Sequence, residues 1–146
     1  MEEMNQLKVF TVPEANQPVP KLTEMIQDLQ KRRELIASLE VEIDALELVA
    51  ESRRDIVSPA VQKKIDEYNK VVNRFYQLID EIHELGCFLK DLNLGLIDFY
   101  ALLEGRVVYL CWKMGEKQVN HWHEVGKGYA YRQPFDHEDD GMESSG

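Results

Sequence analysis

The sequence lacks any long apolar run, and this absence excludes a membrane-spanning helix. No stretch of its 146 residues approaches the ~18 consecutive apolar residues that cross a bilayer. Residues 1–6 are polar and acidic, without the basic start and apolar centre of a secretory signal. We therefore expect a cytoplasmic protein that does not associate with membranes.

Positive charge is also scarce. The chain carries 17 Lys and Arg against 27 Asp and Glu, a formal net charge of −10. Affinity for phosphate groups needs clustered Lys and Arg, so this balance argues against nucleic acid as a partner and against an anionic membrane surface. Residues 136–146 hold five acidic residues and no Lys or Arg. This composition predicts a disordered tail, because the segment has little apolar surface with which to fold.

Cysteine is rare: the sequence contains only Cys87 and Cys111. Under the reducing conditions of a cytoplasm, two cysteines far apart in the chain are expected as free thiols. The sequence also lacks a phosphate-binding glycine loop and the compact zinc motifs CxxC and HExxH. These absences favour a protein without enzymatic activity.

What the sequence does have is two long heptad patterns. Apolar residues recur at alternating spacings of three and four over about residues 21–51, where Arg32 is the one polar member, and again over 59–85. Two such helices joined by a short polar turn predict a long, antiparallel, coiled-coil-like hairpin over about residues 12–86. In this pairing Arg32 lies beside Ile79, with Asp80 and His83 near enough to receive its guanidinium.

A short helical segment precedes the first long helix. Thr11 is an expected N-cap, with Pro13 in the first turn and Glu14 at the capping-box position. Pro18 and Pro20 then predict a break before the long helix begins.

After Gly86 the pattern changes to short apolar runs separated by turn residues. These runs predict a small antiparallel β segment over about residues 87–135. The expected fold is therefore α+β and mainly α, in a single domain of residues 1–135. The expected strands are 87–91, 96–103, 107–112 and 119–125, and Gly126 and Gly128 are expected to loosen the backbone before residues 129–135.

The β segment contains candidate metal ligands. On a strand over 119–125, His121 and His123 share one face with Cβ atoms roughly 6–7 Å apart, a spacing suited to two ligands of zinc or a similar divalent ion. One alternative is that they are half-exposed polar residues on an edge strand. Another pairs Cys111 with His123 as nucleophile and base, but no motif supplies an oxyanion hole. A third metal ligand would come from Asp98, Glu104, Cys111 or His137, none of them fixed by spacing.

Aromatic residues are concentrated in the same C-terminal third. Large aromatic side chains are expected in the core of a small β segment, and this interpretation is favoured over a ligand pocket. The residues concerned are Tyr109, Trp112, Trp122, Tyr129 and Tyr131.

Short words along the chain carry a family resemblance. They are FTVPEAN at 10–16, KDL at 90–92, GLIDF at 95–99, VYLCW at 108–112, WHE at 122–124 and RQP at 132–134. In this order they resemble a prokaryotic family known as domain of unknown function 2203. The resemblance implies a helical N-terminal region and a small C-terminal β segment, and it implies no activity.

The resemblance also ranks the candidate ligands. Asp98, Cys111, His123 and Glu124 fall within the family words, whereas His121 lies where the family varies. A metal site of His123, Asp98 and Glu124 is therefore favoured, with His121 as a further candidate. One departure from the family is Tyr100, which stands where the family usually has proline.

Two functions remain open. The first is a non-enzymatic coiled-coil scaffold, a homodimer whose β segment recognises an unknown protein partner. The second is a metal-binding protein or metal-dependent enzyme with a divalent ion near His123. Val41 and Leu48 are the expected dimer interface, because a two-helix hairpin leaves this face of the first long helix in water. The expected partner-binding residues are Trp112, Trp122 and Arg132.

Overall fold

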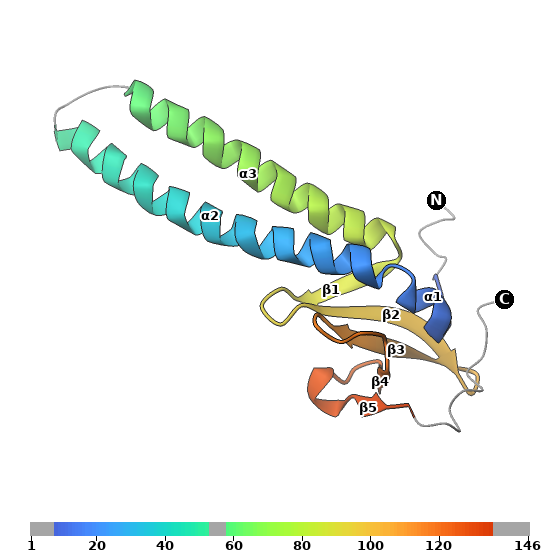
Figure 1. Ribbon diagram of the computed structural model, residues 1–146. Helices are drawn as coiled ribbons and strands as arrows, with labels where there is room; N and C mark the ends of the chain where they lie inside the picture. The colour runs from blue at the N-terminus through green and yellow to red at the C-terminus, as the bar shows by residue number, and fades with distance from the viewer. Residues whose placement is uncertain (1–7, 53–57, 136–146) are drawn as a thin grey trace, which may run out of the picture. The chain divides into compact units, whose positions relative to one another are not determined.

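The computed structural model describes residues 8–52 and 58–135, which form helices and one antiparallel sheet (Figure 1). Helix is the more abundant element, so the predicted α+β, mainly α class is confirmed. Most of the predicted polar turn (53–57) and the predicted acidic tail (136–146) lie outside the described residues. The elements are α1 Val12–Asn16, α2 Val19–Ser52, α3 Pro59–Glu84, β1 Cys87–Asp91, β2 Leu96–Leu103, β3 Arg106–Lys113, β4 His121–Glu124, the 3-10 turn η2 Tyr129–Tyr131 and β5 Gln133–Pro134.

The chain divides into two compact units, which we describe separately. The helical unit comprises the described residues between Gln27 and Asp80. The sheet unit comprises the described residues up to Ile26 and from Glu81 onward, and therefore contains α1 and all five strands. None of the described helices combines the length and the apolar character needed to cross a bilayer.

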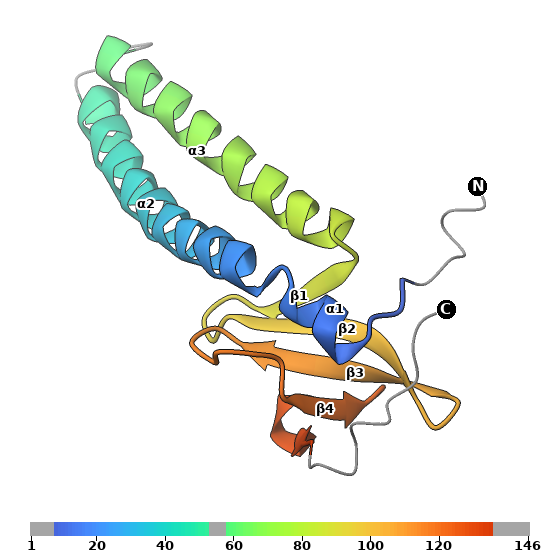
Figure 2. The same ribbon diagram turned by 45° about the vertical axis from the view of Figure 1, so that its right-hand side comes forward.

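The sheet is a simple meander in which each strand pairs antiparallel with the next, in the order β1-β2-β3-β4-β5 (Figure 2). Its central hairpin closes on Glu104 and Gly105, which both have positive φ angles of 52° and 79°. Two successive residues with positive φ suit a tight two-residue hairpin turn. This turn pairs Leu103 with Arg106 and thereby sets the register of β2 against β3.

One face of the sheet holds the core of the sheet unit. Six apolar residues of this face on β2 and β3 are fully buried: Ile97, Phe99, Ala101, Val108, Leu110 and Trp112. Phe10 lies edge-on to Phe99 with ring centroids 5.0 Å apart. The backbone N–H of Phe10 also donates to the carbonyl oxygen of Tyr100. Because side chains alternate along a strand, the other face carries a different set: Asp98 and Tyr100 from β2, Tyr109 and Cys111 from β3, and His121 and His123 from β4.

The N-terminal helix follows its local sequence signals. Thr11 Oγ1 accepts a hydrogen bond from the Glu14 backbone N–H, and the Glu14 carboxylate accepts one from the Thr11 N–H, which completes the predicted capping box. The helix ends at Asn16, and α2 begins at Val19, so the predicted proline break is confirmed.

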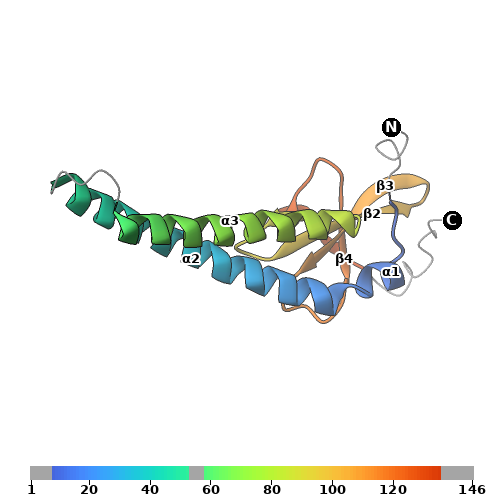
Figure 3. The ribbon, with the colours of Figure 1, turned by 90° about the horizontal axis from the view of Figure 1, so that it is seen from above.

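In the helical unit, α2 and α3 run side by side (Figure 3). The Tyr68 hydroxyl donates to the Glu40 carboxylate at 3.0 Å, and Lys64 Nζ lies 2.9 Å from a carboxylate oxygen of Glu42. These contacts join the two helices at their polar margins. That the helices form one continuous coiled-coil hairpin stays a prediction.

Two details of the predicted heptad packing differ from the structure. On α3 the buried apolar positions are Val71, Leu78 and Ile82, of which Ile82 is a predicted seam residue, whereas the predicted seam residue Ile79 is only half-buried. The buried stripe therefore follows the predicted seam only in part. Arg32 binds Asp28 on its own helix, with Nε 2.7 Å from the carboxylate, rather than the predicted Asp80. A partner four residues away on the same helix is reached without crossing to another element.

The fourth strand is shorter than the sequence predicts: it covers His121–Glu124 instead of 119–125. The end of the predicted β segment is a 3-10 turn followed by the two-residue strand β5. Contacts within the sheet unit fix this end, because the side chain of Arg132 donates two hydrogen bonds to Glu116 and Tyr129 lies against the Arg132 guanidinium.

Candidate metal centre

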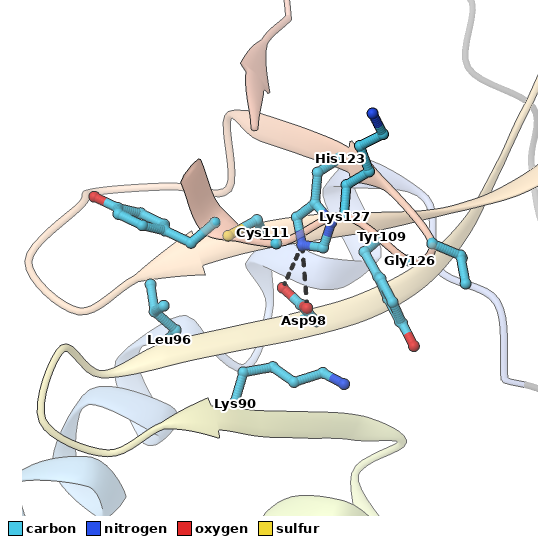
Figure 4. Close-up of a pocket in the computed structure, with 11 residues that line it drawn as sticks. Lys90, Leu96, Asp98, Tyr109, Cys111, His123, Gly126 and Lys127 are labelled. Carbon is cyan, nitrogen blue, oxygen red and sulfur yellow. Dashed lines mark hydrogen bonds and ion pairs between the residues drawn. The ribbon is translucent and has the colours of Figure 1, made fainter. Parts of the chain in front are cut away.

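Three strands bring a carboxylate, a thiol and an imidazole together on the polar face of the sheet. Asp98 and Cys111 are direct partners on β2 and β3, and His123 on β4 is paired with Tyr109, two residues before Cys111. One ligand atom from each of the three side chains lies within 4.8 Å of the other two. Figure 4 shows the His123 ring pointing at the Asp98 carboxylate, with the sulfur of Cys111 beside them.

All three side chains are buried. Asp98 is 4% exposed, Cys111 1% and His123 3%. Carboxylates and imidazoles are rarely buried to this degree without a compensating partner, because removing a charge from water is costly. In the described part of the chain, Asp98 and His123 are the buried polar residues, so the cluster stands out from the rest of the fold.

The orientation of His123 is fixed at both ring nitrogens. Nδ1 lies 3.0 Å from the backbone carbonyl oxygen of Glu124, which can only accept, so Nδ1 carries a proton and donates. Nε2 lies 3.2 and 3.3 Å from the two carboxylate oxygens of Asp98. If the ring is neutral, its Nε2 lone pair faces a carboxylate. The arrangement is therefore satisfied by one proton shared between the two groups or by a cation between them.

Burial shapes the chemistry of the other two groups. It raises the pKa of the Asp98 carboxyl, although the neighbouring His123 and Lys90 act in the opposite direction. Burial and the negative charge of Asp98 raise the pKa of the Cys111 thiol to about 12. Cys111 is then a neutral thiol at neutral pH, and both nitrogens of His123 are engaged elsewhere. The nucleophile–base interpretation of Cys111 and His123 therefore loses its support.

A pocket of about 390 Å³ opens beside the cluster (Figure 4). The connection after β4, which contains Gly126 and Gly128, forms one side of it. Two cationic side chains, Lys90 and Lys127, also line the pocket. Its apolar and aromatic walls come from Leu96, Tyr109, Val125 and Tyr129.

The structure separates the two other predicted ligands from this cluster. Glu124 follows His123 on β4 and therefore points to the opposite face of the sheet, where it forms an ion pair with Arg106. His121 shares the face of His123, but its Nδ1 lies nearest Glu116, 3.8 Å from a carboxylate oxygen. Burial and the nearby Arg132 lower the pKa of His121.

The three residues predicted to bind a partner make contacts with other residues of the sheet unit. Trp112 is fully buried in the core, and its indole N–H donates to the backbone carbonyl oxygen of Glu116. Trp122 is half-buried, with the Arg106 guanidinium 5.7 Å from its ring centroid. Arg132 donates to both carboxylate oxygens of Glu116. Burial acts to raise the pKa of Glu116, but the Arg132 hydrogen bond and charge outweigh it, and the pKa is lowered.

Sequence reasoning named Cys111 only as one of several third ligands and missed Lys90 and Lys127. A signal for Cys111 was present in the two-residue turn. Leu103 and Arg106 are partners at the turn. Asp98 lies five residues before Leu103 and Cys111 five residues after Arg106, so these two are direct partners as well. No comparable signal in the sequence places Lys90 or Lys127 at the same pocket.

Comparison with known proteins agrees with the sequence words. The chain matches no curated protein and no solved structure. A family model described as an uncharacterised conserved protein, DUF2203, matches residues 8–135, which include Asp98, Cys111 and His123. Because the match covers most of the chain, the protein belongs to the domain of unknown function 2203 family.

Proposed function

We propose that this chain is a metal-binding protein in which Asp98, Cys111 and His123 hold a divalent cation. The observation that carries the proposal is the convergence of three different ligand atoms within 4.8 Å in a buried site. Zinc bonds of ~2.0–2.3 Å in tetrahedral geometry place neighbouring ligand atoms about 3.3–3.8 Å apart. The three side chains are thus close to the spacing that such an ion requires.

The hydrogen bond from His123 to Glu124 supports the same assignment. Histidines that bind a metal through one ring nitrogen usually donate the other N–H to a carbonyl or carboxylate, which fixes the tautomer and the orientation of the ring. Here Nδ1 donates to the Glu124 carbonyl oxygen, and Nε2 is directed at the cluster.

The donor set indicates the kind of ion. One sulfur, one nitrogen and one carboxylate oxygen are a mixture that zinc accepts, and a Cys111 thiolate with an Asp98 carboxylate would neutralise a doubly charged ion. Binding would release the thiol proton of Cys111. Structural zinc sites use four protein ligands, whereas three ligands leave one position open. The nearby pocket therefore favours a site that also binds a small molecule.

The first test uses protein purified without affinity-column metal. We expect elemental analysis to find a stoichiometric transition metal, and we expect titration of the metal-free protein with Co²⁺ to produce a thiolate-to-cobalt charge-transfer band. The Cys111→Ser variant should lose this band. Cys87→Ser is the matched control, because Cys87 is an equally buried thiol that donates to the Ile82 carbonyl oxygen away from the cluster.

Two results would contradict the metal site. One is protein that contains no stoichiometric metal and binds no Co²⁺, in which case Asp98 and His123 are a buried ion pair alone. The other is a charge-transfer band that persists in Cys111→Ser and disappears in Cys87→Ser.

A scaffold function is the second candidate, and exposed aliphatic residues on α2 support it. Val41 is 69% exposed and Leu48 68%, and the two are seven residues apart on one side of the helix. Burying a Val or Leu side chain contributes ~1.5–3 kcal/mol. On this proposal α2 and α3 form the long coiled-coil hairpin, and the Val41–Leu48 face joins two copies into a symmetric homodimer.

Sedimentation velocity tests the dimer. The wild-type chain is expected to sediment as a dimer, and a Val41→Glu, Leu48→Glu double variant as a monomer, because the substitutions place four carboxylates in a symmetric apolar interface. An Asn69→Glu, Gln77→Glu double variant adds the same two charges at exposed positions of α3 and should remain dimeric. A monomeric wild type, or equal dissociation of both variants, would end the proposal.

A further inference from the structure

The pocket beside the cluster has the size and the lining of a small-molecule site. Its volume of about 390 Å³ lies near the lower end of the ~300–1,000 Å³ that is usual for such sites. Asp98, Cys111 and His123 are themselves part of its lining. An ion held by these three residues would therefore present its remaining coordination position to the pocket.

From this pocket we infer that the protein binds a small organic acid, with the carboxylate on the metal ion and an apolar body against the pocket walls. The inference rests on the proposed metal centre and adds the class of ligand.

The charge of the site calls for an anion. A doubly charged ion is balanced by the Asp98 carboxylate and the Cys111 thiolate, which leaves the positive charges of Lys90 and Lys127. Asp98 is the one acidic residue among the described residues that line the pocket. A bound carboxylate would meet both an open metal position and an excess of positive charge, and charge-assisted contacts of this kind are the stronger polar interactions.

Each of the two lysines has its ammonium group near an aromatic ring. Lys90 Nζ lies 5.0 Å from the ring centroid of Tyr109 and 5.5 Å from that of Phe88. Lys127 Nζ lies 5.2 Å from the ring centroid of Tyr131. Contacts between a cation and a ring face restrict these long side chains without neutralising them. The positive charges are therefore kept near the pocket and available to an anion.

The walls distinguish an organic acid from a free inorganic anion. Leu96, Val125, Tyr109 and Tyr129 offer apolar surface that phosphate would leave uncovered. Arginine forks, which suit phosphate, are not among the described lining residues.

The test uses the full chain loaded with Co²⁺, with loading measured for each variant. Benzoate is expected to change the visible d–d spectrum of the bound Co²⁺ saturably. Benzamide, its neutral isostere, is not expected to change the spectrum. Lys90→Gln and Lys127→Gln should each weaken benzoate binding by roughly tenfold or more, the value of one charge-assisted contact. Lys63→Gln, an exposed lysine of α3 outside the pocket, should bind benzoate as the wild type does.

The outcomes separate the two proposals. Protein that loads Co²⁺ but whose spectrum benzoate leaves unchanged overturns the organic-acid site and leaves the metal centre standing. Phosphate that changes the spectrum at lower concentration than benzoate overturns the assignment to an organic acid. Equal binding of benzoate and benzamide overturns the role of charge. Failure to load Co²⁺ overturns both proposals.

Discussion

Replacing Trp112 with Ala is expected to lower the free energy of unfolding by ~3–5 kcal/mol, the usual cost of removing a large aromatic side chain from a core. Trp112 is fully buried on the apolar face of the sheet. The substitution also removes the hydrogen bond from its indole N–H to the Glu116 carbonyl oxygen, which measures 2.9 Å. Urea denaturation followed by far-UV circular dichroism measures the loss, and a milder Trp112→Phe variant serves if the Ala variant does not fold.

The matched control is Trp122→Ala. Trp122 is half-buried and has the Arg106 guanidinium over its ring, so its removal should cost clearly less than that of Trp112. Equal costs for the two substitutions would show that Trp112 is not the core residue that its burial indicates. The comparison also bears on partner binding, because a fully buried ring offers no surface to another protein.

The His123→Ala variant, measured in the presence of a chelator, is expected to lose ~3–5 kcal/mol of unfolding free energy. The substitution leaves the Asp98 carboxylate buried without its partner, and an uncompensated buried charge is strongly destabilising. Replacing both residues together, in an Asp98→Leu, His123→Leu variant, should restore much of this loss, because a buried ion pair contributes little net stability over apolar residues of similar volume.

His121→Ala is the control for this second prediction. His121 is on the same strand and the same face, but about a quarter of its side chain is exposed, and its nearest acidic group is 3.8 Å away. Its removal should change the stability by under about 1 kcal/mol. If the double Leu variant is as unstable as His123→Ala alone, the destabilisation does not come from the unpaired carboxylate.

The extent of most elements was predictable because local chemistry sets it. The capping box at Thr11 starts α1, the prolines separate it from α2, and Gly86, with a φ of 97°, follows the end of α3. The turn at Glu104 and Gly105 sets the register of the central hairpin, and β1 and β2 begin and end at the predicted residues. The family words added an independent reason to expect the same order of elements.

The site was only partly predictable. Asp98 and His123 were named as ligands from the sequence, but Glu124 was named with them although adjacent residues on a strand point to opposite faces. Strand alternation alone could have excluded Glu124. The same rule, applied with the register of the hairpin, could have identified Cys111 as the ligand beside Asp98. Tertiary structure decided the rest, since only the arrangement of β1 and the connection after β4 places Lys90 and Lys127 beside the cluster.

What the sequence determined by itself was therefore local: where α1, β1 and β2 begin and end, and which strand residues share a face. Burial was decided by tertiary structure, because it depends on what covers each face. Heptad spacing did not distinguish Leu78, which is buried, from its half-buried neighbour Ile79. The structure of residues 129–135, for which the sequence pattern predicted no particular element, likewise depends on the contacts of Arg132 with Glu116 and Tyr129. Side chains distant in the chain determine both results, and periodicity within one segment contains no information about them.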